Sequence, residues 1–502
     1  EGKRSHIFVA DVSTGTATDL TPELKVNTPP APFGDSTDYA FSPDGQELAF
    51  TAEPEKDAAW STNTDIWTVS LGSGALKNIT KSNPAADQHP AYAPDGLALA
   101  YVCQKRAGFE ADLWSLVLAD RDGERIVDLS SQLDRPVISH AWAGNGRDLF
   151  AVIDDHGAEP IVAIDARGGT RPDGNRVLSH DWVRKVVATG ANTAAQPTHD
   201  AKQVVFVRAE TAHPSELFRA NADGSDLTPL TRHNASLVAD LDLAPAEAFQ
   251  VEASDGASVG GFLVRPPGFD ASKKYPVVFL IHGGPQGAWH DEWHGRWNTA
   301  LFAAPGYVVV AVNPRGSTGY GQKFTDQISG DWTGKVYDDL MKGLDYALKK
   351  YSFLDSSRVA AAGGSYGGFM VDWIAGHSDR FKALISHAGV FDLPSMYATT
   401  EELWFPEWEF RGLPWKAPTL YDEQSPSHFA GSFHTPTLVI HGALDFRVPD
   451  AQGLGMFTVL QRQGVPSRLV YFPDEGHWIA KPDNRIVWWR EVHAWLKKYL
   501  QD

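Results

Sequence analysis

The first residues that could do chemistry together lie in Arg358–Met370, which reads RVAAAGGSYGGFM. An apolar run, Val359–Ala362, leads into glycines on both sides of Ser365, and a segment of helical character follows. This is a Gly-x-Ser-x-Gly pattern between a strand and a helix, where the serine sits on a strained turn and larger flanking residues would collide. The pattern predicts that Ser365 is a nucleophile at a helix start, which favours negative charge. The alternative is a glycine-rich turn with an incidental serine.

A serine hydroxyl needs a base to take its proton and a third group to orient that base. Asp445 follows the apolar run Leu438–Ile440, and His477 follows the run Arg468–Phe472. Serine, aspartate and histidine therefore occur in the chain order of α/β-hydrolases. Taken singly, the aspartate could cap a helix or turn, and the histidine could be a loop residue. Taken together, the three predict a catalytic triad.

The oxyanion that forms during acyl transfer needs at least two donors aimed at it in advance. One predicted donor is the backbone N–H of Tyr366, directly after the nucleophile. The second is the N–H of Gly284 in the loop after Val277–Ile281, where glycine lets the backbone approach a substrate closely. His282, at the end of that strand, is expected to hold the loop rather than to act as a second base.

The elements that would position these residues lie in the second half of the chain. A hairpin around Asp255-Gly256 is followed by apolar runs that alternate with amphipathic segments, which predicts a mostly parallel sheet with helices on both faces. We therefore expect an α/β-hydrolase domain over residues 246–502, with the site at the carboxyl ends of the strands. The candidate strands are Val277–Ile281, Val308–Val312, Val359–Ala362, Ala383–Ser386, Leu438–Ile440 and Arg468–Phe472, and the candidate helices are Val336–Tyr351, Phe369–Gly376, Gln452–Arg462 and Arg485–Leu500.

Residues 1–245 repeat a turn between two short apolar strands. The turn is Pro-Asp-Gly at Asp44 and Asp95 and is weaker at Asn145, so the copies stand 51 and 50 residues apart. A second hairpin with an aspartate and an aromatic residue follows, as in Asp65–Val69 and Asp112–Leu116. Four strands in about 50 residues are typical of a propeller blade. The pattern predicts a β-propeller of about four blades and a half, truncated at its N-terminus.

Composition excludes several classes of function. The formal charge of −19 argues against nucleic acid as a partner, and no apolar run is long enough to span a membrane. Cys103 is the only cysteine, so neither an internal disulfide nor a cysteine-rich zinc site is expected. Nothing in the pattern calls for a metal or a cofactor. The 502 residues are enough for two domains.

Five motifs together resemble the prolyl oligopeptidase family of serine peptidases, and within it the dipeptidyl peptidase V and acylaminoacyl peptidase groups. In chain order they are His282-Gly283-Gly284-Pro285, Asn313-Pro314-Arg315-Gly316-Ser317-x-Gly319-Tyr320-Gly321, Gly363-Gly364-Ser365-Tyr366-Gly367-Gly368, Asp445-x-Arg447-Val448-Pro449 and Gly476-His477. The resemblance implies a propeller that restricts entry to short peptides. Because the family's propellers have more blades, it also implies that propeller segments precede Glu1.

The resemblance further implies a set of substrate-binding residues. Arg447 would hydrogen-bond a substrate carbonyl, or else pair with a nearby acid, and Val448 would line the specificity pocket. Three aromatic residues would line the same pocket or belong to the core: Trp404, Phe405 and Trp408. A dipeptidyl peptidase also needs an acid for the substrate's N-terminal ammonium. The candidates in this stretch are Glu401, Glu402, Glu407 and Glu409, and the alternatives are a propeller carboxylate or one in a segment that precedes Glu1.

These observations predict a serine exopeptidase that releases dipeptides from the N-termini of short peptides through an acyl-enzyme. The alternatives are an acylaminoacyl peptidase or oligopeptidase of the same family, a carboxylesterase and, from another class, a non-catalytic propeller binding module. A homo-oligomer is left open. The sequons at Asn78 and Asn234 and the absence of a starting methionine favour a secreted or periplasmic protein over a cytoplasmic one.

Overall fold

The computed structural model describes residues 3–31, 34–53, 58–171 and 181–501. The chain forms two compact units, one of Glu1–Arg208 with Glu216–Arg232, the other of Ala209–Ser215 with His233–Asp502. The domain boundary at residue 245, which rests on the change in sequence pattern, stays a prediction.

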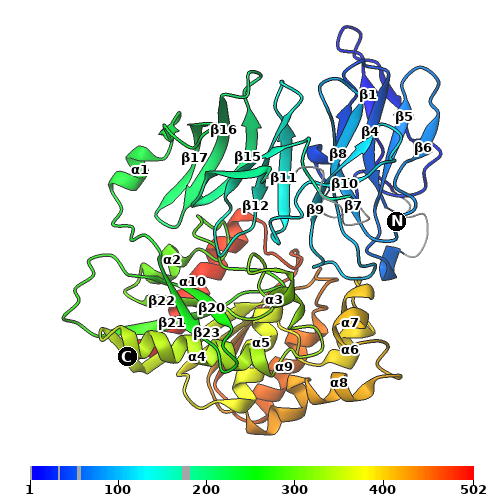
Figure 1. The fold of residues 1–502 in the computed structure, drawn as a ribbon. Coiled ribbons are helices and arrows are strands. Elements are labelled where there is room, and N and C mark those ends of the chain that lie inside the picture. The colour runs from blue at the N-terminus through cyan, green and yellow to red at the C-terminus, as the bar shows by residue number, and fades with distance from the viewer. Residues whose placement is uncertain (1–2, 32–33, 54–57, 172–180, 502) are drawn as a thin grey trace. The chain divides into compact units, whose positions relative to one another are not determined.

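The first unit consists of small sheets whose strands are adjacent in chain order, the arrangement of propeller blades. It contains four four-stranded sheets and one two-stranded sheet within the described residues (Figure 1). The two-stranded sheet is β1 (Phe8–Ala10) and β2 (Ala17–Asp19); the others are β3 (Tyr39–Phe41), β4 (Glu47–Ala52), β5 (Asp65–Ser70) and β6 (Leu76–Asn78); β7 (Asp87–Tyr92), β8 (Ala98–Cys103), β9 (Ser115–Asp120) and β10 (Val127–Asp128); β11 (Val137–Trp142), β12 (Asp148–Ile153), β13 (Ile161–Asp165) and β14 (Val183–Val187); and β15 (Ala191–Pro197), β16 (Gln203–Glu210), β17 (His213–Asn221) and β18 (Thr228–Pro229).

One predicted strand begins later than expected. The repeat placed a strand at Asp112–Leu116, but β9 starts at Ser115. The carboxylate of Asp112 accepts hydrogen bonds from the backbone N–H groups of Lys105 and Arg106 at 2.7 and 2.8 Å, and from the Arg106 guanidinium at 2.6 Å. These bonds keep the residues just before β9 in a loop.

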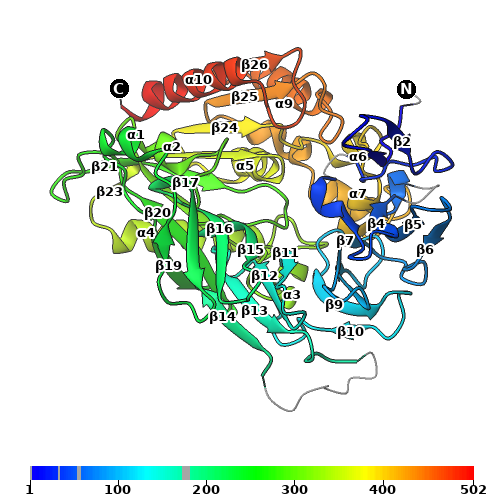
Figure 2. The same ribbon diagram turned by 90° about the horizontal axis from the view of Figure 1, so that it is seen from above.

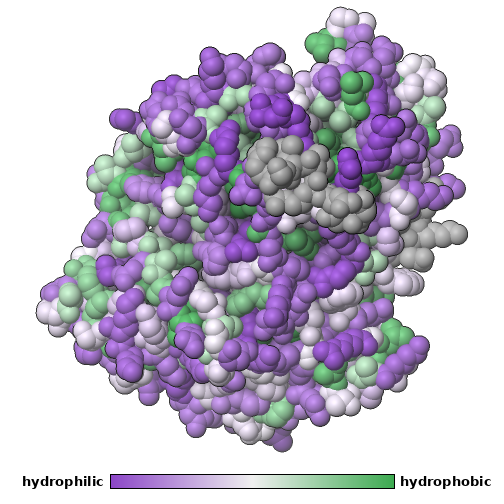
Figure 3. Space-filling view, in the orientation of Figure 1, coloured by the Kyte–Doolittle hydropathy of each residue, from purple (hydrophilic) through white to green (hydrophobic). Residues whose placement is uncertain are grey.

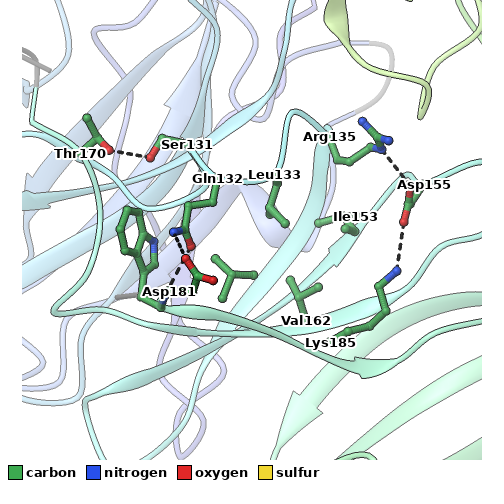
Figure 4. Close-up of a pocket in the computed structure, with 12 residues that line it drawn as sticks. Ser131, Gln132, Leu133, Arg135, Ile153, Asp155, Val162, Thr170, Asp181 and Lys185 are labelled. Carbon is green, nitrogen blue, oxygen red and sulfur yellow. Dashed lines mark hydrogen bonds and ion pairs between the residues drawn. The ribbon is translucent and has the colours of Figure 1, made fainter. Parts of the chain in front are cut away.

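A hollow of about 660 Å³ lies in the propeller unit against β12, β13 and β14, and we call it the propeller hollow (Figure 4). Its charged side chains bond to other residues of the lining. Asp155 accepts from Arg135 at 2.8 Å and from Lys185 at 3.1 Å, and Gln132 donates to Asp181 at 2.9 Å.

The second unit is built on an eight-stranded sheet in the order β19-β20-β22-β21-β23-β24-β25-β26. Pairing is antiparallel from β19 to β22 and parallel from β22 to β26. This confirms the α/β-hydrolase prediction, because parallel strands need covering layers on both faces. The strands are β19 (Glu247–Glu252), β20 (Ser258–Val264), β21 (Tyr275–Ile281), β22 (Val308–Asn313), β23 (Leu354–Gly364), β24 (Ala383–His387), β25 (Thr437–Gly442) and β26 (Ser467–Phe472).

Helices cover both faces of this sheet. Alternate residues of β21 explain why: Val277, Phe279 and Ile281 join one core, with α4, α5 and α9, while Val278 and Leu280 join the other, with α2 and α10. Figure 2 shows α10 and α5 on opposite sides of β24. The helices are α1 (Ala235–Ala239), α2 (Thr299–Ala303), α3 (Gln322–Asp326), α4 (Lys335–Lys350), α5 (Tyr366–His377), α6 (Leu393–Tyr397), α7 (Trp404–Glu409), α8 (Pro418–Glu423), α9 (Ala451–Arg462) and α10 (Pro482–Leu500).

The face shown in Figure 3 is mainly hydrophilic, with apolar side chains scattered over it. Among the helices of the described residues, none combines the length and the hydrophobicity that crossing a bilayer requires. The secreted or periplasmic location stays a prediction.

Candidate active site

Ser365 lies on a sharp turn between β23 and α5. Its backbone has φ 57° and ψ −121°, a strained conformation for a residue with a side chain. The flanking glycines are required by space, because a Cβ on Gly363 would lie 2.4 Å from the backbone of Gly367, and one on Gly367 would lie 2.2 Å from the carbonyl oxygen of Ile281. The turn therefore has the geometry of a nucleophile elbow, in which the serine hydroxyl projects from the end of the sheet.

Asp445 and His477 follow β25 and β26, and their side chains meet. The distance from His477 Nδ1 to Asp445 Oδ2 is 2.7 Å. The other carboxylate oxygen of Asp445 accepts from the backbone N–H groups of Val448 at 2.9 Å and Arg447 at 3.1 Å. Burial acts to raise the pKa of Asp445, but the hydrogen bond and charge of His477 outweigh it and lower that pKa. The aspartate is thus held ionised against the imidazole.

His387, at the end of β24, connects the serine turn to the histidine loop. Its carbonyl oxygen accepts from the Ser365 N–H at 2.9 Å, and its Nε2 lies 3.3 Å from the carbonyl oxygen of His477. The indole N–H of Trp488 donates to His387 Nδ1 at 2.8 Å, so Nε2 carries the proton. Burial lowers the pKa of His387 to about 3, which keeps it neutral. No motif in the sequence predicted a role for this residue, although its place directly after the predicted strand Ala383–Ser386 was a usable signal.

A buried carboxylate fixes the loop that carries His477. Glu475 accepts from the backbone N–H groups of Ala480 at 2.8 Å and Lys481 at 3.0 Å, and from the side chain of Asn484 at 2.7 Å. Its own carbonyl oxygen accepts from the N–H of Leu444 at 2.9 Å, next to Asp445. Glu475 thereby ties the aspartate loop to the histidine loop, a role with no signature in the sequence.

The two predicted oxyanion donors, the backbone N–H groups of Tyr366 and Gly284, lie at a helix start and in a glycine loop. Tyr366 is the first residue of α5, so its N–H has no partner inside the helix, and its hydroxyl is occupied by the carbonyl oxygen of Trp332 at 2.7 Å. Gly284 has φ +125°, which favours glycine. A Cβ on the preceding Gly283 would lie 3.3 Å from Ser365 Cβ, which places this loop beside the serine.

His282 holds that loop, as predicted. Its Nδ1 lies 2.8 Å from the carbonyl oxygen of Gly283, and its Nε2 lies 3.0 Å from the hydroxyl of Ser317. Burial lowers the pKa of His282 to about 4. Both ring nitrogens are engaged, which leaves none for a second base.

Arg447 pairs with an acid, the alternative that the sequence left open. Its guanidinium lies 2.5 Å from Glu402 and 3.8 Å from Glu401, and it sits over the Trp478 ring at 5.1 Å. Two further bonds tie the Glu401–Glu402 segment to the Asp445 loop: Thr400 Oγ1 donates to the Arg447 carbonyl at 2.8 Å, and the Glu401 N–H to the Phe446 carbonyl at 2.8 Å. This acidic pair therefore lies directly beside the loop that carries Asp445.

The other candidate acids have partners of their own. Glu407 accepts from the Tyr397 hydroxyl at 2.9 Å, and the buried Glu409 accepts from Trp332, Gln286 and Ser329 at 2.7–3.0 Å. Of the candidate pocket residues, Phe405 and Val448 belong to the core, with 8% and 2% of their surface exposed, Trp404 packs against that core, and Trp408 is half-buried.

Asp372 is a buried carboxyl on α5, two turns beyond Ser365. Neither of its oxygens makes a hydrogen bond of good geometry within the described residues, and the nearby Ser386 hydroxyl only partly offsets the effect of burial. Burial raises its pKa well above the usual value, because a low-dielectric site disfavours the charged form. The folded protein therefore keeps this proton at pH values where the unfolded chain has lost it.

Replacing Asp372 by asparagine is expected to raise the melting temperature at pH 8 by about 3 °C or more. In the unfolded chain this carboxyl ionises near pH 3.9, so wild-type stability falls as pH rises above that value through the folded pKa, and the amide has no such loss. The gain should shrink towards pH 4, where the wild-type carboxyl is protonated in both states. Thermal unfolding at pH 5 and 8, with the exposed Asp422→Asn as control, measures this. A variant less stable than the wild type at pH 8 would contradict the account.

Comparison with known proteins places this geometry in a family context. The sequence profile of the prolyl oligopeptidase family matches residues 293–502. A relative from Schizosaccharomyces pombe, named dipeptidyl-peptidase 5, is 33% identical over 498 residues, which cover 98% of this chain and 70% of the relative. One of the same name from Porphyromonas gingivalis is 32% identical over 506 residues, covering 99% of this chain and 72% of the relative.

Solved structures share the fold at lower identity. An acylaminoacyl peptidase from Pyrococcus horikoshii superposes with a TM-score of 0.71 at 20% identity, covering 99% of this chain and 85% of the other. Dipeptidyl peptidase 4 from Porphyromonas gingivalis gives 0.68 at 18% identity, covering 98% of this chain and 67% of the other. These similarities concern the fold alone.

Proposed function

Since the chain belongs to the prolyl oligopeptidase family of serine peptidases, we propose that it releases dipeptides from the N-termini of short peptides, with Ser365, Asp445 and His477 as its triad. The relatives named dipeptidyl-peptidase 5 support this choice. The observation that carries it is the carboxylate pair Glu401 and Glu402, tied to the loop of Asp445 and facing Arg447.

In the proposed reaction, Ser365 Oγ attacks the carbonyl carbon of the second substrate residue while His477 Nε2 takes its proton. The backbone N–H groups of Tyr366 and Gly284 stabilise the oxyanion. Collapse breaks the C–N bond, and His477 protonates the leaving amine. A water molecule, deprotonated by His477, then attacks the acyl carbon. The bond to Ser365 Oγ breaks, His477 returns the proton to that oxygen, and the dipeptide leaves. Throughout, Asp445 accepts the hydrogen bond from His477 Nδ1, which fixes the tautomer and stabilises the imidazolium.

Glu402 is the proposed acid for the substrate ammonium. Its side chain is 14% exposed, so an ion pair there is poorly screened by water, unlike one at an exposed carboxylate. Arg447 would then turn its planar donors to a substrate carbonyl, while Glu402 receives the cation. An extended chain spans about 3.3–3.6 Å per residue, so an acid that binds the ammonium two residues from the scissile bond has to lie near the triad. Glu402 meets this condition through its ion pair with Arg447, two residues after Asp445.

Replacing Glu402 by glutamine is expected to lower kcat/KM for an Ala-Ala-chromophore substrate by about ten- to hundredfold, the usual worth of a charged hydrogen bond. An acetyl-Ala-chromophore substrate, which has no ammonium, should change less than about threefold by the same argument. Glu407→Gln is the matched control, because that acid lies nearby with a different partner. Equal losses on both substrates, or the larger loss in the control, would remove Glu402 from this role.

The preference for the free amine should also depend on pH. Burial, with the charges of Glu401 and Asp445, raises the pKa of Glu402 to about 7 against the opposing effect of Arg447. Below pH 7 the protonated acid loses its charge, so the ratio of kcat/KM values for the free and acetylated substrates should fall by up to about tenfold per pH unit. In Glu402→Gln the ratio of the two kcat/KM values should not change with pH. Any pH effect on the catalytic groups acts on both substrates equally and cancels in this ratio.

The choice between the two peptidase activities is tested by the same substrates on the wild type. Faster release from acetyl-Ala-chromophore than from Ala-Ala-chromophore would make the protein an acylaminoacyl peptidase, as in the fold neighbour from Pyrococcus horikoshii. Failure of the wild type to react with a fluorophosphonate probe would instead favour the non-catalytic binding module.

A further inference from the structure

A second charged site lies next to the loop that carries His477. It is a small pocket, which we call the arginine pocket, lined by Arg296, Arg485, His387 and an aromatic wall. The remaining lining residues are Trp297, Trp478, Ile479, Trp488 and Trp489. All come from the hydrolase unit.

The pocket borders the reacting groups directly. Trp478 and Ile479 follow His477 in the chain, and His387 bonds to the His477 carbonyl. On the opposite wall, a Cβ on Gly364, next to Ser365, would lie 2.9 Å from Trp297. The pocket therefore adjoins both the serine turn and the histidine that must protonate the leaving amine.

The protein compensates its positive charges only in part. Within the described residues no carboxylate forms an ion pair with Arg296 or Arg485, and the guanidinium of Arg296 makes no hydrogen bond. Arg485 Nε donates a hydrogen bond to the carbonyl oxygen of Ile479 at 3.2 Å. Burial and the charge of Arg485 lower the pKa of Arg296, and the nearby Glu292 only partly offsets this. Two half-buried guanidinium groups are costly to hold together unless an anion joins them.

The small volume of the pocket limits how much of an anion can enter it. Its free volume of about 20 Å³ admits one water-sized group. The site therefore suits an anionic oxygen that enters between the two arginines, while the bulk of the ligand stays outside. Guanidinium groups match carboxylate oxygens well, and the aromatic wall keeps water from screening the charges.

We propose that the arginine pocket binds the C-terminal carboxylate of the leaving amino acid, so that the enzyme is tuned to tripeptides. This inference rests on the proposed function. In a tripeptide cut after its second residue, the leaving group is a free amino acid whose carboxylate is two bonds from the nitrogen that His477 protonates. An anion so close to the leaving nitrogen has to sit beside His477, where this pocket lies. Glu402 would then bind the ammonium at one end of the tripeptide, and the arginine pocket would bind the carboxylate at the other end.

The test compares Ala-Ala-Ala with Ala-Ala-Ala-amide, which differ only at this carboxylate. The wild type should favour the free acid by about tenfold or more in kcat/KM, the worth of a charge-assisted hydrogen bond. Arg296→Gln and Arg485→Gln should each remove most of that preference by slowing the acid, whereas Arg296→Lys should retain part of it. Arg490→Gln, an exposed change on the same helix, is the control. Fluorophosphonate labelling reports that each variant still carries a folded nucleophile.

Equal rates on the acid and the amide in the wild type would overturn the proposal, as would an Arg296→Gln variant that slows both substrates alike. The outcome is separable from that of the dipeptidyl activity. If the enzyme cleaves only blocked substrates, acetyl-Ala-Ala and its amide provide the same comparison, since the leaving group is again a single alanine with or without its carboxylate.

Discussion

Replacing Ser365 by alanine is expected to lower kcat by about 10⁵- to 10⁶-fold, the scale of loss when a triad serine is removed from a protease of another fold. The methyl group keeps the turn but removes the atom that forms the acyl-enzyme, so labelling by a fluorophosphonate should vanish with the activity. Burst kinetics on a chromogenic dipeptide substrate and labelling measured on the same preparation test both consequences.

The fold of the variant should be unchanged, because Ser365 carries its strain in the backbone and alanine retains the N–H that donates to His387. Ser378→Ala, at the far end of the same helix, is the matched control and should keep full labelling. Residual labelling of Ser365→Ala at the wild-type rate would identify a different nucleophile and refute the triad.

The sheet could be predicted because its strands are buried on both faces. Runs such as Val308–Val312 are apolar throughout, a pattern typical of strands in a parallel sheet that is covered on both faces. The strands of this sheet contain all the apolar runs predicted for it. The four helices predicted in the same domain differ from α4, α5, α9 and α10 by a few residues at their ends. The strand expected at Asp112–Leu116 was misplaced because Asp112 is held in a loop by the backbone N–H groups of Lys105 and Arg106 and by the Arg106 guanidinium. Bonds between a side chain and a neighbouring loop leave no periodic pattern in the sequence.

The site was predictable only where chemistry imposes a residue type at a strand end. Ser365, Asp445 and His477 meet that condition, and the glycines around the serine are explained by lack of space, because a Cβ on Gly367 would lie 2.2 Å from the carbonyl oxygen of Ile281. His387 and Glu475 were missed because they act through hydrogen bonds between loops that only the folded sheet brings together. The pairing of Arg447 with Glu402 joins residues 45 positions apart, and the sequence offered four acids without a way to choose among them.

Replacing Asp445 by asparagine is expected to lower kcat by about 10⁴-fold, as the equivalent change does in a Ser-His-Asp protease of unrelated fold. The reason lies in the bonds that the carboxylate makes here. One oxygen accepts from the backbone N–H groups of Val448 and Arg447, and the other faces His477 Nδ1 at 2.7 Å. An asparagine oxygen that keeps the two backbone bonds turns its NH₂ group towards the histidine.

That NH₂ group can only donate, so His477 has to accept at Nδ1 and carry its proton on Nε2. A protonated Nε2 cannot take the proton of Ser365. The nucleophile therefore loses its base, although the other groups of the site stay in place. Asp450→Asn is the control, because this aspartate lies five residues further along and accepts from the Tyr471 hydroxyl instead. The histidine tautomer, read from the ¹⁵N chemical shifts of His477, should switch only in Asp445→Asn. An unswitched tautomer with full loss of activity would mean that Asp445 acts through its charge alone and that orientation of the base is secondary.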